Sequence, residues 1–252
     1  MRALLLFVLF AAIQLLAALL SRLATGTQSP TAVGTSLLLC EGTLAAFLWF
    51  WFKKEQQKRD APTQHAAEGA PVLGTGIRSL PARQGFSILA AILLGFGLSL
   101  LLEPLHLPDD GTQALFDGMK QNVWCLLLLC FVGPLCEELV FRAGILHALR
   151  RQGLPGWLAA GISALSFALI HGNLVQGIPA FIIGCVLGLF YLRTNSLALC
   201  LPAHIANNVF AVVLLFSPHL THFTSLWPAS AVIALGLLHF GLGILNVWRA
   251  LR

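Results

Sequence analysis

Apolar residues fall into long unbroken runs along this chain, and short polar stretches separate the runs. Each run continues for about 20 residues, the length of helix that spans the hydrocarbon core of a bilayer. A transmembrane β-strand is shorter and alternates apolar with polar positions, which these runs do not do. The pattern therefore predicts an all-α polytopic membrane protein with about eight transmembrane helices, at residues 3–20, 33–52, 85–104, 121–149, 157–172, 176–192, 197–217 and 228–248.

Composition supports a membrane protein. Of the 252 residues, 58% are apolar and 10% are charged, whereas a soluble domain carries about 25% charged residues. The formal charge of +5 by itself would suggest an acidic partner such as nucleic acid. All six cysteines lie in or beside apolar runs without a CxxC pair, so we expect buried thiols and neither a zinc site nor disulfides.

The distribution of lysine and arginine explains the positive charge as membrane topology. Basic residues concentrate in cytoplasmic loops, and the 53–84 stretch holds six of them: Lys53, Lys54, Lys58, Arg59, Arg78 and Arg83. Eight alternating helices then place both termini in the cytoplasm and leave Arg22 and Lys120 outside, near Glu103 and Asp117. We expect no nucleic-acid partner, and the Leu/Ala-rich composition favours a bacterial cytoplasmic (inner) membrane.

Three parts follow from this topology. Residues 1–52 form two N-terminal transmembrane helices, residues 53–84 a cytoplasmic linker rich in Ala, Gly, Pro and Gln, and residues 85–252 a six-helix section. The composition of the linker is typical of a solvated tether.

The fourth apolar run contains "PLCEELVFRAG", in which two glutamates and an arginine interrupt a membrane-spanning pattern. Each ionisable side chain near the bilayer centre costs about 2.5–3.5 kcal/mol. Glu138 and Arg142 are i,i+4 neighbours on a helix and can pair. Glu137 points about 100° away from that pair, so its carboxylate is the best candidate for a functional role. Glu41 in the second run could approach the same site, snorkel or bond a neighbouring helix.

Three runs bring polar side chains to nearly one depth. With a rise of 1.5 Å per residue, Glu137 lies about 20 Å and His171 about 21 Å from the cytoplasmic end of its helix. Asn208 lies about 18 Å and His204 about 12 Å from the cytoplasmic end of theirs. His204 and Asn208 share one helix face, as Phe167 and His171 do. The spacing predicts that these side chains converge.

Such a cluster suits amide hydrolysis by activated water. A carboxylate beside an imidazole can take a proton from water, and a histidine with an asparagine amide can stabilise an oxyanion. Cys136 is an alternative nucleophile. Zinc is a further alternative, because Glu137, His171 and His204 form a His₂Glu set, although the sequence contains no HExxH.

Three short motifs carry a resemblance to a known family. "EELVFR" (137–142), "FALIH" (167–171) and "HIANN" (204–208) are similar to the ordered motifs EExxxR, FxxxH and HxxxN. These belong to the CAAX prenyl protease and bacteriocin-processing (type II CAAX) family of intramembrane endopeptidases. The similarity covers about residues 120–215. One departure is Ala143, where many members have glycine.

The resemblance implies an eight-helix membrane fold and a metal-independent glutamate protease. Glu137 and His171 would activate water, and His204 and Asn208 would form the oxyanion hole. The site would be supported by four further residues: Glu138, Arg142, Phe141 and Phe167. The substrate would be a membrane-tethered protein or peptide, which is prenylated in eukaryotic members.

We therefore expect an endopeptidase that cuts a membrane-tethered peptide close to the cytoplasmic side. One alternative is a non-proteolytic immunity or scaffold protein on the same fold. Another is a proton-coupled transporter, which is disfavoured because no inverted repeat or pair of Gly/Pro-broken helices stands out.

Overall fold

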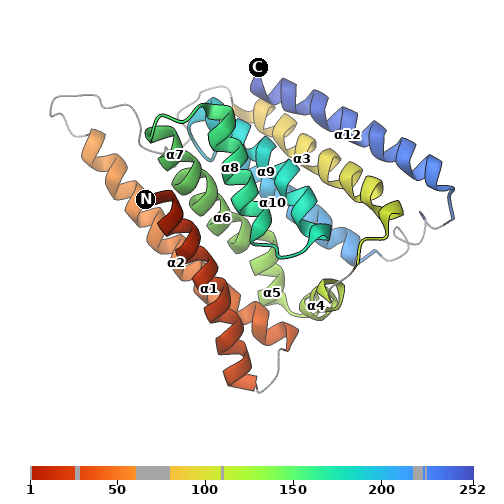
Figure 1. Cartoon of the computed structure of the whole chain (residues 1–252), viewed down its shortest axis with the longest axis horizontal. Coiled ribbons are helices and arrows are strands. Elements are labelled where there is room, and N and C mark those ends of the chain that lie inside the picture. The colour runs from red at the N-terminus through yellow and green to blue at the C-terminus, as the bar shows by residue number, and fades with distance from the viewer. Residues whose placement is uncertain (1, 26–28, 61–79, 109–110, 218–223, 225) are drawn as a thin grey trace.

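The computed structural model describes residues 2–25, 29–60, 80–108, 111–217, 224 and 226–252. Throughout these ranges the regular elements are helices (Figure 1). Five are long: α1 (Arg2–Thr25), α2 (Pro30–Asp60), α3 (Leu80–Leu102), α9 (Leu174–Thr194) and α12 (Ala229–Leu251). Four are shorter: η1 (Glu103–Leu105), α4 (Thr112–Met119), α8 (Gly156–Leu169) and α10 (Cys200–Leu215).

One further helix runs without a break from Val123 to Arg151. It consists of α5 (Val123–Leu127), η2 (Leu128–Val132), α6 (Gly133–Glu137), η3 (Glu138–Leu146) and α7 (His147–Arg151). The all-α membrane fold predicted from the apolar runs is confirmed, and each of the eight predicted runs coincides with a helix.

Helix length distinguishes two groups among the eight. In the described residues six helices are long and apolar enough to cross a membrane. The other two, α8 and α10, have 14 and 16 residues and rise about 21 and 24 Å, less than the roughly 30 Å hydrocarbon core. The eight-span count and the cytoplasmic termini therefore stay predictions.

Both ends of the predicted 53–84 linker are helical. Helix α2 continues through Asp60 and α3 already begins at Leu80, because the charged residues after Lys53 extend the second helix beyond its apolar part. The remaining linker residues, 61–79, lie outside the described residues.

The Val123–Arg151 helix widens into π-helical turns at η2 and η3. Pro134 lacks an N–H and cannot complete the α-helical ladder after η2, which explains the first widened segment. Side chains of neighbouring helices bind backbone carbonyls in both segments. Asn208 Nδ2 donates to Leu129 O at 3.0 Å, and Ser163 Oγ donates to Phe141 O at 2.7 Å. The widened turns thereby become docking points for α10 and α8.

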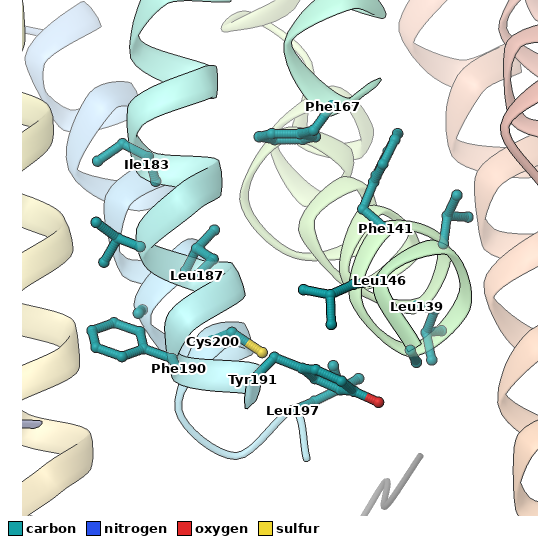
Figure 2. Packing of buried hydrophobic residues seen from close by; sticks show 14 of the residues in the cluster. Leu139, Phe141, Leu146, Phe167, Ile183, Leu187, Phe190, Tyr191, Leu197 and Cys200 are labelled. Carbon is teal, nitrogen blue, oxygen red and sulfur yellow. The ribbon is translucent and has the colours of Figure 1, made fainter. Parts of the chain in front are cut away.

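Part of the buried core lies where η3, α9 and the start of α10 meet. Leu146 comes from η3, Leu187 and Tyr191 from α9, and Leu199 and Cys200 from the start of α10, and all five are at most 1% exposed. Figure 2 shows Leu146, Leu187, Tyr191 and Cys200 below Phe141 and Phe167 in this view, with Tyr191 and Cys200 side by side. Phe141 and Phe167 belong to the same buried hydrophobic cluster.

Candidate active site

A cavity of about 1030 Å³ is lined by Phe167 together with residues of α2, α3, α4, α6, α9 and α10. All four residues predicted to be catalytic line it: Glu137, His171, His204 and Asn208. They come from α6, from the turn after α8, and from α10. The convergence expected from helix depth is thus found in the structure.

Glu137 has a partner that the sequence did not indicate. Its side chain is 16% exposed at the cavity wall, and Oε2 lies 3.5 Å from His204 Nε2. The carboxylate is therefore held beside an imidazole while one face stays accessible from the cavity, as a general base requires.

Glu138, the next residue, is fully buried and makes two charged contacts. Its Oε1 lies 2.9 Å from Arg142 Nη1, which confirms the predicted pair, and 2.8 Å from His204 Nδ1. Arg142 is also fully buried, and its Nη2 donates to Gly184 O on α9 at 3.2 Å. The opposite charges offset part of the cost of burying each other, while Glu138 Oε2 and Arg142 Nε are buried without a hydrogen-bond partner among the described residues. The contacts hold the ring of His204 between the two glutamates.

Phe167 is the centre of the packing beneath the site. Its ring makes edge contacts with His171 and His204 at centroid distances of 5.0 and 5.6 Å, and with Phe141 at 5.3 Å. The Arg142 guanidinium lies 4.8 Å from the same ring centroid, in range of a cation–π contact. Phe141 and Phe167 therefore lie where residues that support the site should lie.

His171 follows the end of α8 in a turn completed by Gly172, whose φ is 73°. Its Nδ1 lies 2.9 Å from Phe167 O. A carbonyl only accepts, so Nδ1 carries a hydrogen, and the tautomer with Nδ1–H leaves Nε2 as an acceptor. Asn208 donates one amide hydrogen to Leu129 O at 3.0 Å, and a primary amide has a second N–H to offer.

Comparison with known proteins shows which family this part of the chain resembles. Residues 119–210 match the model of the family "Type II CAAX prenyl endopeptidase Rce1-like". This segment is therefore similar to the Rce1-like family. The chain is also 28% identical over 111 residues to the Bacillus subtilis protein named "Putative membrane peptidase YdiL", which covers 44% of this chain and 45% of that protein.

A second relative is "Uncharacterized protein YyaK" of Bacillus subtilis, 25% identical over 185 residues, or 64% of this chain and 61% of that protein. The matches thus span about half to three fifths of these curated relatives. No solved structure matches the chain significantly.

Glu41 lies outside the Rce1-like segment, yet it belongs to the same cavity. Its side chain on α2 is buried, and Oε1 accepts a hydrogen bond from Gln14 Nε2 on α1. Two of the three possibilities raised from the sequence therefore hold, since Glu41 approaches the site and bonds a neighbouring helix. The sequence signal for Glu41 was a lone carboxylate in an apolar run. The sequence did not show whether the face of α2 that carries Glu41 turns toward the site.

The alternative chemistries find less support. Cys136 is fully buried and is absent from the cavity wall, which contradicts its role as a nucleophile. Within the described residues, no three His, Cys, Asp or Glu side chains are arranged to hold a metal ion. The geometry lends no support to zinc at the Rce1-like site, and the absence of a cofactor stays a prediction.

Proposed function

We propose that this chain is an intramembrane endopeptidase that hydrolyses a peptide bond in a membrane-tethered protein or peptide. The observation that carries the proposal is the convergence of Glu137, His171, His204 and Asn208 on one cavity inside the helix bundle. The Rce1-like family of residues 119–210 supports the same function. The proposed location is a bacterial cytoplasmic membrane.

Glu137 and His171 are assigned to the activation of water. The Glu137 carboxylate is partly exposed to the cavity, and His171 presents Nε2 because Nδ1 is engaged by Phe167 O. A carboxylate and an imidazole acceptor on one cavity wall can share the proton that leaves the attacking water. The resulting hydroxide adds to the carbonyl carbon of the substrate. When the tetrahedral intermediate collapses, the C–N bond breaks and the proton taken from water passes to the leaving amine nitrogen.

His204 and Asn208 are assigned to the oxyanion. Nδ1 of His204 is bonded to Glu138, so the ring is held with Nε2 toward Glu137 and the cavity. In the doubly protonated ring both nitrogens donate, and Nε2 is the one that can reach an oxyanion. The second N–H of Asn208 supplies another donor. Glu138 and Arg142 act by positioning His204.

The test is cleavage by the purified full chain of a farnesylated CAAX peptide and a panel of membrane peptides, with and without a chelator. We expect cleavage by the wild type that the chelator leaves unchanged, and none by Glu137→Ala. Glu55→Gln is the matched control, because Glu55 is a carboxylate on α2 away from the cavity. Equal cleavage by Glu137→Ala would contradict the assignment of the base.

Two other results would point elsewhere. Loss of cleavage on chelation, together with stoichiometric zinc in the purified protein, would favour the metal mechanism. No cleavage of any peptide would favour the immunity or scaffold alternative.

A further inference from the structure

The proposed reaction uses Glu137 and leaves a second carboxyl of the cavity, Glu41, without a role. Glu41 is 5% exposed and lies on α2, outside the segment that matches the Rce1-like family. It nevertheless lines the cavity together with Glu137. An ionisable side chain within an apolar, membrane-crossing helix is costly and marks a functional site by default. The surroundings of its two oxygens indicate a function.

The two carboxyl oxygens of Glu41 have different neighbours. Oε1 accepts a hydrogen bond from Gln14 Nε2 on α1. Oε2 forms no hydrogen bond with any other residue that the structure describes. An ideal Cβ placed on Gly133 would lie 3.6 Å from Oε2, so this oxygen lies against the surface of α6. One oxygen is therefore held by α1, and the other is available to a ligand in the cavity.

The position of Gly133 places Oε2 beside the catalytic base. Gly133 and Glu137 are the first and last residues of α6. As i,i+4 neighbours they lie on one helix face, about 6 Å apart along the axis. Both line the cavity. Glu41 Oε2 thus lies about one helical turn from Glu137, on the wall where the peptide of the proposed function would bind.

Glu41 has no cationic partner in the described part of the chain. Besides three thiols, the elements packed against α2 carry six ionisable side chains: Arg2, Arg22, Asp117, Glu137, Glu138 and Arg142. Arg142 pairs with Glu138, and Asp117 pairs with Lys120. Arg2 and Arg22 stand near the two ends of α1. The partner that Glu41 does have, Gln14, is uncharged.

These surroundings favour the neutral acid at Glu41. Two carboxylates on one poorly hydrated wall do not readily ionise together, so one of them retains a proton. Glu137 keeps 16% of its side chain exposed and lies 3.5 Å from the imidazole of His204, which favours its charged form. Glu41 is more deeply buried and has only an amide beside it. The proton therefore belongs to Glu41.

A protonated Glu41 presents a hydrogen-bond donor to the cavity. A carboxylic acid accepts through one oxygen and donates through the other. Because Oε1 accepts from Gln14, the hydrogen is carried by Oε2, the oxygen next to Gly133. Every peptide substrate offers backbone carbonyl oxygens, which accept such a bond.

We infer that Glu41 is a substrate-binding residue of this site, a neutral carboxylic acid whose Oε2–H donates to a backbone carbonyl of the peptide next to Glu137. The inference rests on the proposed function and adds a contact from α2 to the residues of the Rce1-like segment. The group recognised is the peptide backbone, so the contact does not depend on the side chains of the substrate. A contact of this kind holds ground state and transition state alike, and its loss therefore raises KM more than it lowers kcat.

Two substitutions of Glu41 distinguish a neutral acid from an ionised one. An amide has the hydrogen-bonding pattern of a protonated acid, with an acceptor for Gln14 and a donor for the cavity. Glu41→Gln should therefore keep KM within about threefold of the wild type, whereas Glu41→Leu should raise KM about tenfold with kcat nearly unchanged. The measurement is steady-state cleavage, by the purified full chain, of the peptide that the wild type cleaves best. Equal losses in Glu41→Gln and Glu41→Leu would overturn the inference, as would an unchanged KM in Glu41→Leu.

Gln14→Leu is the control for a purely structural role. It removes the same bond between α1 and α2 but leaves the carboxyl that donates to the substrate. Its thermal unfolding in detergent should resemble that of Glu41→Leu, while its KM should rise by no more than about threefold. If Gln14→Leu raises KM as much as Glu41→Leu does, Glu41 acts only through helix packing and the inference is wrong.

The protonation of Glu41 is measured without cleavage. A protonated carboxyl gives an infrared C=O band that carboxylates lack. At neutral pH this band should lose intensity in purified Glu41→Gln and stay in Glu55→Gln, which makes the same change on α2 away from the cavity. A band that Glu41→Gln leaves intact would overturn the inference, even if Glu41→Leu does not fold. If the wild type cleaves no peptide, the proposed function fails and the substrate contact with it, while the band still shows whether Glu41 is a neutral acid.

Discussion

The two halves of the Val123–Arg151 helix carry adjacent glutamates with opposite surroundings. Up to Glu137 the helix borders a cavity, and the next segment, η3 (Glu138–Leu146), is buried between α1, α8 and α9. Glu137 keeps 16% of its side chain exposed, whereas Glu138 is fully buried with Arg142 and His204. One step along the helix thus separates an accessible base from a buried structural charge. Substitutions in the packed half should lower stability, and substitutions in the half that borders the cavity should lower activity.

The largest effect is expected in the packed half. Arg142→Met leaves the Glu138 carboxylate buried without its cation, which should lower the free energy of unfolding by about 3–5 kcal/mol. Thermal unfolding in detergent measures the loss. The double variant Glu138→Leu/Arg142→Met should regain most of the stability and remain inactive, because His204 loses its anchor. Similar stability of the single variant and the wild type would contradict the role of the pair.

The cavity half should lose activity instead of stability. Glu137→Gln removes the base and should reduce the cleavage rate by about 10²–10⁴-fold, with the unfolding temperature unchanged. Glu138→Gln is the comparison, since it should lower both the rate and the unfolding temperature. If the two variants behave alike, the proposed division between the adjacent glutamates is wrong.

A glycine at the cavity wall should report on packing around Asn208. A Cβ added at Gly95 on α3 would overlap the side chain of Asn207, which donates to Asn208 Oδ1 at 3.4 Å. Gly95→Ala should therefore cost about 1–3 kcal/mol in thermal unfolding and slow cleavage. Gly85→Ala on the same helix meets no atom within 4 Å and should leave both measurements nearly unchanged.

The smallest effect is expected where the site helix begins. The Asn122 side chain accepts from the backbone N–H of Trp124 at 2.8 Å and of Cys125 at 3.4 Å. Asn122→Ala should lower the free energy of unfolding by about 1 kcal/mol, and Asn122→Asp should retain the cap. A loss of activity beyond this loss of stability would show that the start of the helix also shapes the cavity.

Helix periodicity explains which parts of the site could be predicted. The pairing of Glu138 with Arg142 is confirmed, because i,i+4 neighbours meet on any helix. The shared level of Glu137, His171 and Asn208 followed from rise per residue. The contact of His204 with both glutamates could not be predicted, because it depends on how α10 is rotated against η3. The place of Glu41 in the cavity likewise depends on which face α2 turns inward.

Taken by itself, the sequence determined the all-helical membrane fold, the eight apolar segments and the identity of the polar residues that meet at the site. These follow from local properties, namely hydropathy, helical period and rise per residue. Only the tertiary structure decided that His204 contacts both Glu137 and Glu138, that Cys136 is fully buried away from the cavity, and that the cavity opens toward α4. Those outcomes depend on helix rotation and side-chain packing across elements distant in sequence, which no local pattern encodes.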